Sequence, residues 1–151
     1  MRTLGNILWH FPFFGFLSAL STFLVGGLLF ITLVGTPIGL GLIQLAKFFL
    51  APFTHEMVSK KDAQIKENKL WKNYGIIIRI IYFPFGLILA LITIIQIAGL
   101  FVSLIGIPVA LVLAKSLRTY FNPVGKICIH RDVSLEIRAR KAKEKADKLN
   151  S

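Results

Sequence analysis

The sequence predicts an all-α membrane protein: two helical hairpins repeated in parallel, four membrane segments in all, and then a basic C-terminal helix. The first reason is that charge and apolar character occupy separate stretches. The chain has a net charge of +11, yet residues 3–46 and 80–114 contain no Asp, Glu, Lys or Arg. A helix needs about 20 apolar residues to cross a bilayer. Each uncharged block is therefore long enough to cross at least once.

The second reason is an internal repeat at an offset of about 71 residues. Shared prolines carry more weight than shared leucines, because any two membrane segments share leucines. Residues 8–12 match residues 80–84, and after one skipped position Phe14-Gly15 falls on Phe85-Gly86. Residues 33–38 then match 104–109, and Pro52 falls on Pro123. We interpret this pattern as a duplication.

Each unit is predicted to begin with an entry turn at its proline, Pro12 or Pro84, and to continue as a long helix over 13–33 or 85–104. A glycine-x-proline break follows, because proline ends one helix and suits the first turn of the next. The second helices are expected over 37–50 and 108–120. The break residues are Gly35, Pro37, Gly106 and Pro108.

The predicted organisation has four parts: a first membrane hairpin (1–54), a basic loop (55–73), a second membrane hairpin (74–126) and a basic tail helix (127–151). The loop and the tail are rich in Lys and Arg, which places both in the cytoplasm and makes the chain multi-pass. If each unit crossed only once, these two regions would lie on opposite sides. Hairpins are therefore favoured, although the short second helices either cross fully or are re-entrant.

The sequence lacks the constellations that catalysis requires. All carboxylates lie in the basic loop and tail, and Cys128 is the only cysteine, so no cysteine-based metal cluster or intrachain disulfide is expected. We expect no enzyme activity, no cofactor and no metal. The long apolar runs also argue against a nucleic-acid binder, despite the basic composition.

Small and polar residues form stripes at helical spacing within the two long helices. Such a stripe either lets helices pack closely or lines a permeation path, and both interpretations remain open. The stripe residues are Ser18, Thr22, Gly26, Thr93, Gln96 and Ser103.

Three cations lie near the ends of the second helices: Lys47, Lys115 and Arg118. They either extend to phosphates at the membrane edge or form a basic ring that attracts anions or anionic lipid head groups. The tail helix carries a heptad-spaced seam that consists of Leu135, Ala139, Ala142, Ala146 and Leu149. A seam built mainly of alanine suits weak self-association, and its basic opposite face suits anionic lipid.

Several of these motifs together resemble the YccF family of small bacterial inner-membrane proteins, which carry a paired inner-membrane-component domain. They are residues 1–9, the segments Gly35-Thr36-Pro37-Ile38-Gly39 and Gly106-Ile107-Pro108-Val109, and the closing Asn122-Pro123-Val124-Gly125-Lys126. The resemblance covers about residues 1–129, with a departure at Thr54, where the second repeat has glycine. It implies a bacterial cytoplasmic membrane and brings no established activity.

Two functional hypotheses follow. The first is an oligomeric ion channel or transport component with anion preference, in which the pore forms between copies around a symmetry axis. The second is a non-conducting accessory or scaffold subunit that binds a partner protein or anionic lipid. The expected partners are the lipid bilayer, anionic head groups and further copies of the chain.

Overall fold

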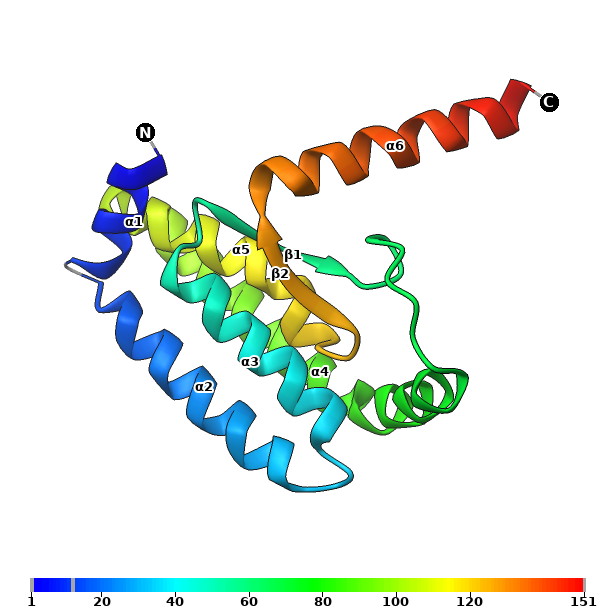
Figure 1. Cartoon of the computed structure of the whole chain (residues 1–151). Helices are drawn as coiled ribbons and strands as arrows, with labels where there is room; N and C mark the ends of the chain where they lie inside the picture. The colour runs from blue at the N-terminus through cyan, green and yellow to red at the C-terminus, as the bar shows by residue number, and fades with distance from the viewer. Residues whose placement is uncertain (1, 12, 151) are drawn as a thin grey trace.

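The computed structural model describes residues 2–11 and 13–150, and it is mostly helical (Figure 1). In chain order the elements are α1 (Arg2–His10), α2 (Gly15–Ile31), α3 (Thr36–Leu50), β1 (His55–Ser59), α4 (Lys69–Val102), the 3-10 helix η1 (Leu104–Gly106), α5 (Ile107–Phe121), β2 (Lys126–His130) and α6 (Arg131–Asn150). Both halves of the chain contain helix, break, helix and strand in that order. The predicted breaks between long and short helices occupy residues 32–35 and 103–106.

Within residues 2–11 and 13–150, two helical segments are long and apolar enough to cross a membrane: α4, with 34 residues, and the continuous stretch Leu104–Phe121, with 18. A third is possible if α1 and α2, which meet at 76°, count as one span. At about 1.5 Å per residue, α4 extends roughly 50 Å, whereas the 15 residues of α3 extend only about 22 Å. The two predicted second helices, α3 and α5, have 15 residues each, and both are shorter than the hydrocarbon thickness of about 30 Å. They differ in that η1 extends α5 to the 18-residue stretch, whereas α3 has no such extension.

The two entry segments also differ, and the predicted turn at Pro84 is wrong. Helix α4 continues through this proline without interruption, so its N-terminal end lies well before the predicted start at residue 85. In the first half, α1 ends at His10 and α2 begins after Phe14, which has a left-handed φ of 51°. Pro12 itself lies outside the described residues. The first half has one more residue here than the second, and this insertion accompanies the break.

A two-stranded antiparallel sheet, which the sequence does not predict, joins the ends of the two halves. Strand β1 occupies the start of the predicted loop 55–73, and β2 replaces the beginning of the predicted tail helix 127–151, which starts only at Arg131. The register pairs His55 with His130 and Ser59 with Lys126. Each strand has only five residues and follows a proline-containing turn, so neither gives the long alternation that predicts a strand.

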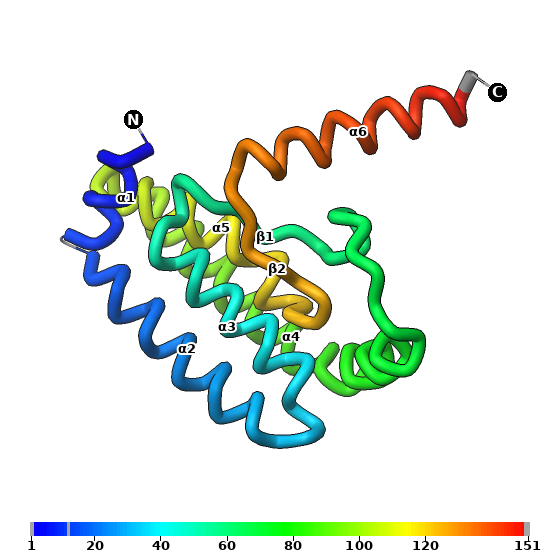
Figure 2. The backbone as a smooth tube through the Cα atoms, viewed as in Figure 1, coloured from blue at the N-terminus to red at the C-terminus, as the bar shows by residue number. Residues whose placement is uncertain are grey.

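The sheet lies across one face of the short helices α3 and α5, and α6 leaves its end to project away from the helices (Figures 1 and 2). Contacts cross between the halves, since α3 packs on β2 and α5 packs on β1. Beneath the sheet lies a small core formed by Trp9, Ala19, Leu45, Phe48, Phe49 and Val112. By contrast, the outward faces of α2 and α4 expose large apolar side chains along their length, as expected for surfaces that contact lipid.

Candidate functional site

The threonines of the polar stripe turn their hydroxyl groups toward their own helices. Thr22 Oγ1 donates to the Ser18 carbonyl at 2.7 Å, and Thr93 Oγ1 donates to the Leu89 carbonyl at the same distance. Thr93 is buried, whereas Thr22 is half-buried. Each hydroxyl therefore gives its proton to a carbonyl of its own helix, as threonines commonly do within apolar helices.

Gly26 lies in the contact between α2 and α3. A Cβ atom there would approach the backbone nitrogen of Ile43 to 3.0 Å, and one at Gly39 would approach the Gly26 oxygen to 2.5 Å. The two glycines therefore let the backbones of α2 and α3 come together, as small residues do in membrane helix pairs. This contact is one of packing.

Gln96 and Ser103 occupy a different environment from the rest of the stripe. Both are exposed on α4, and a Cβ atom at the intervening Gly99 would meet nothing within 4 Å. The structure therefore separates the predicted stripe into buried or packed positions and an exposed polar face of α4. We call the latter, Gln96 with Gly99 and Ser103, the α4 polar face.

The break glycines hold matching positions in the two halves. Gly35 caps α3 with φ −81° and ψ −11°, and Gly106 caps α5 with φ −76° and ψ −13°. A Cβ atom at Gly35 would lie 2.7 Å from the Leu29 oxygen, and one at Gly106 would lie 2.6 Å from the Leu100 oxygen. Pro37 and Pro108 follow within the first turn of each new helix. Glycine is required here by the close approach of the preceding helix end.

The three candidate cations do not share one environment. Lys47 and Arg118 are exposed. Lys115 instead bonds across to the other half, where its Nζ donates to the Pro52 carbonyl at 3.1 Å and lies 5.2 Å from the centre of the Phe53 ring. Lys115 thus ties α5 to the turn before β1.

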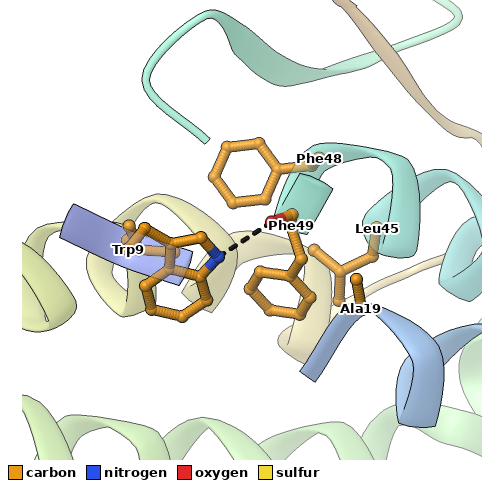
Figure 3. Packing of buried hydrophobic residues seen from close by; sticks show 6 residues of the cluster. Trp9, Ala19, Leu45, Phe48 and Phe49 are labelled. Atoms are coloured by element: carbon orange, nitrogen blue, oxygen red, sulfur yellow. Dashed lines mark hydrogen bonds between the residues drawn. The ribbon is translucent and has the colours of Figure 1, made fainter. Parts of the chain in front are cut away.

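Trp9 anchors the N-terminal helix to the core, a role that the sequence alone does not indicate. Its indole Nε1 donates to the Phe49 carbonyl at 2.8 Å, and the two rings stack with centroids 5.9 Å apart (Figure 3). The bond satisfies a carbonyl in the last turn of α3. In the second half, Tyr82 donates in the same way to the Tyr120 carbonyl at 3.1 Å.

The base of α6 is fixed to the sheet by a group of polar contacts that we call the cap. Glu56 of β1, whose side chain is only 12% exposed, accepts hydrogen bonds from Ser134 at 2.8 Å and from Arg138 at 2.6 Å. Lys141, one turn further along α6, pairs with Asp62 at 2.6 Å. These bonds link residues about 80 positions apart in the sequence, and spacing alone gave no signal of them.

Three groups in the cap, the sheet and the start of α6 have pKa values shifted by hydrogen bonds or by burial. The hydrogen bond from Lys141 holds the pKa of Asp62 below its usual range, and the bond from Arg2 does the same for Asp132. Burial raises the pKa of the Cys128 thiol to about 11, partly offset by the positive charge of Lys47. Cys128 therefore stays protonated at neutral pH and packs against the core. Across residues 2–11 and 13–150, no three His, Cys, Asp or Glu side chains gather as a metal site would require.

A known family model matches the first third of the chain. Residues 4–55 match the family model described as YccF, inner membrane component domain. The YccF resemblance is confirmed over these residues. Together with the apolar helices, it supports an inner-membrane location. Neither the curated proteins nor the solved structures contain a match.

Proposed function

We propose that the chain is a non-conducting accessory subunit of the bacterial inner membrane, anchored by two copies of a YccF-type hairpin, that presents α6 to a partner. The observation that carries this proposal is the state of α6. Its base is held by Glu56 and Asp62, yet its apolar seam from Leu135 to Leu149 is exposed throughout. A long helix that is fixed at one end and uncovered along its seam adds little to the stability of the fold. It is suited to pair with a second helix.

The contacts within the protomer also favour a non-conducting role. The Thr22 and Thr93 hydroxyls donate to carbonyls of their own helices, and the backbone of α3 packs directly against Gly26. These contacts support the helix-packing interpretation for this part of the stripe.

Two features support the arrangement of the hairpins as parallel copies with their polar ends in the cytoplasm. The caps at Gly35 and Gly106 have nearly the same backbone angles, and the sheet brings the two hairpin ends together. A sheet shared by both ends requires them to lie on one side of the membrane. The basic residues of the loop and of α6 favour the cytoplasm as that side.

The test combines a seam variant with a flux assay. Ala142→Glu with Ala146→Glu should abolish the association of α6, scored by cross-linking in membranes, while Lys143→Glu, which changes the charge by the same amount outside the seam, should preserve it. Wild-type protein in liposomes should pass no more anion than empty vesicles. Anion flux above that leakage, or equal cross-linking in all three proteins, would contradict the proposal.

A second candidate function is an anion-preferring pore between copies, and the α4 polar face favours it. The Gln96 amide is exposed on an apolar helix and has no hydrogen-bond partner among the described residues. In hydrocarbon such a group gains by bonding to another helix. Under this candidate, Gln96→Leu should reduce both the oligomer mass in detergent and the anion flux. Retention of the wild-type mass by this variant would count against it.

A further inference from the structure

A groove of about 340 Å³ opens where the start of α3, the first turns of α4 and the open end of the sheet meet. It lies apart from the cap contacts and from the α4 polar face. Five cations from three segments line it: Lys60, Lys61, Lys72, Arg79 and Lys126. Its volume is near the lower limit for small-molecule sites, which begin at roughly 300 Å³.

Most of this positive charge has no internal counter-ion. Among the described residues, Glu67 is the one carboxylate that lines the groove, and it already pairs with Lys60 at 2.9 Å. In the part of the chain that the structure describes, Lys61, Lys72 and Lys126 form no ion pair. The groove therefore keeps an excess of positive charge that an anion would neutralise.

Lys126 is a partly buried cation of the groove, and the neighbouring cations contribute to lowering its pKa. The pKa of its ammonium group is lowered, first by burial and then by the positive charges of Arg118 and Arg79, while Asp62 acts in the opposite direction. Arg79 itself makes only a long contact of 3.5 Å with the Val124 carbonyl. Most of its guanidinium donors are therefore available to a ligand, and a guanidinium can hold a phosphate through two parallel bonds.

The frame that carries these cations is fixed by bonds between distant segments. Tyr74 donates to the Leu33 carbonyl at 2.6 Å, which ties the first turns of α4 to the turn before α3. The Lys60 amide donates to the Gly125 carbonyl at 2.9 Å, and Gly125 has a φ of 71° that favours glycine. The cations are thus brought together by the fold before any ligand binds, which lowers the cost of binding.

The groove also has an apolar side. Trp71 and Ile76 line it, and beyond them the exposed face of α4 continues with Ile77 and Ile80. Basic pockets between membrane helices on the cytoplasmic side suit phospholipid head groups, and tryptophan is common at that depth. A head group held here would have an apolar helix face beside it for its acyl chains.

We propose that this groove binds a phosphate group, held chiefly by Lys72, Arg79 and Lys126. The assignment rests on the proposed function only in placing the groove at the cytoplasmic surface. It stands whether or not the chain conducts ions or binds a partner through α6. The phosphate belongs either to an anionic phospholipid or to a soluble phosphate compound, and the two sources can be separated experimentally.

The experiment measures ligand retention by full-length protein. In the lipid arm, native mass spectrometry follows phosphatidylglycerol and cardiolipin against phosphatidylcholine. In the soluble arm, protein in phosphatidylcholine nanodiscs is melted with and without inorganic phosphate or pyrophosphate. Wild type should retain anionic lipid, or be stabilised by soluble phosphate, and the variant Lys72→Gln/Arg79→Gln/Lys126→Gln should lose that response by roughly tenfold or more.

Two controls keep the result interpretable. Lys66→Gln/Lys143→Gln/Lys145→Gln removes the same charge at exposed positions outside the groove and should respond within about twofold of wild type. Lys72→Arg/Lys126→Arg keeps the charge and should restore binding. Response in the lipid arm alone identifies a head group, and response in the soluble arm identifies a soluble phosphate. Absence of response in both arms for folded wild type, or equal loss in the two Gln variants, would overturn the assignment.

Discussion

Met57 and Cys128 lie directly opposite each other at the centre of the two-stranded sheet. They are also 71 positions apart in the chain, which is the offset at which the two halves of the sequence align. The outer pairs are related by the same offset. The counterpart of His55 is Lys126, and the counterpart of Ser59 is His130. The pair His55–His130 is therefore the counterpart of the pair Ser59–Lys126. The register is therefore that of a two-fold axis through the Met57–Cys128 pair.

This relationship explains why α3 contacts the strand of the other half. Gln44 of α3 accepts a hydrogen bond from the Cys128 amide at 3.1 Å, and Lys115, its counterpart in α5, bonds to the Pro52 carbonyl. Each short helix thus supports the chain segment that leaves the other. The interface between the halves is built from reciprocal contacts, as isologous interfaces are.

The first prediction concerns Trp9. Trp9→Phe removes the donor to the Phe49 carbonyl and leaves this buried acceptor unsatisfied, which should cost about 1–3 kcal/mol of unfolding free energy. Trp71→Phe provides the control, because this second tryptophan is exposed and should change the free energy by less than about 0.5 kcal/mol. Denaturant titration in detergent measures both. Equal losses in the two variants would show that Trp9 has no special role.

The second prediction compares two helix glycines. Gly39→Ala places a methyl group against the Gly26 oxygen and the Phe30 backbone, neither of which can move alone, and should destabilise the fold by about 1–3 kcal/mol. Gly27→Ala meets open space and should be neutral or stabilise by up to about 1 kcal/mol through helix propensity. Thermal melting in detergent compares the pair. A neutral Gly39→Ala would mean that α2 and α3 do not pack through these glycines.

The third prediction is an acid-dependent release of α6. The pKa of Asp62 in the fold is below its ordinary value of 3.8, chiefly because Lys141 donates to it. A lowered pKa contributes stability above pH 3.8, and this contribution is lost as the pH falls through the value in the fold. A spin label at position 144, in a Cys128→Ser background, should therefore become more mobile below about pH 4.

The control for this titration is Asp62→Asn, which removes the charge at every pH. Its label should be more mobile than that of the wild type at pH 7 and should change less on acidification. If the label in the wild-type cap had the same mobility at pH 7 and pH 3, the pair with Lys141 would not hold α6.

The fourth prediction concerns the reactivity of Cys128. With a pKa of about 11, only about one thiol in a thousand is ionised at pH 8. Because the thiolate is the nucleophile, alkylation by iodoacetamide should be about two orders of magnitude slower than at an exposed cysteine introduced at Lys143. Mass spectrometry of timed samples gives both rates. Comparable rates would mean that Cys128 is not packed against the core.

The sequence predicted the helical features well where the signal was local. The apolar blocks located α2, α3 and α5 to within a few residues, and glycine-x-proline gave the helix breaks. The predicted turn at Pro84 was wrong, because a proline inside a long apolar helix is tolerated when neighbouring groups satisfy the freed carbonyl. The cap was not predictable in this way, since Glu56 meets Arg138 only once the sheet has formed. The groove likewise depends on segments that are distant in sequence.

The central claim is that the two hairpin ends are joined by this sheet, and Met57→Cys tests it most directly. The new cysteine would lie opposite Cys128, within reach of a disulfide in an antiparallel pair. Full oxidation in membranes should give an intramolecular disulfide that changes the monomer's mobility on a non-reducing gel. The control Val58→Cys, whose side chain points to the opposite face, should form little or none. No disulfide in Met57→Cys, or equal yields in both variants, would contradict the account.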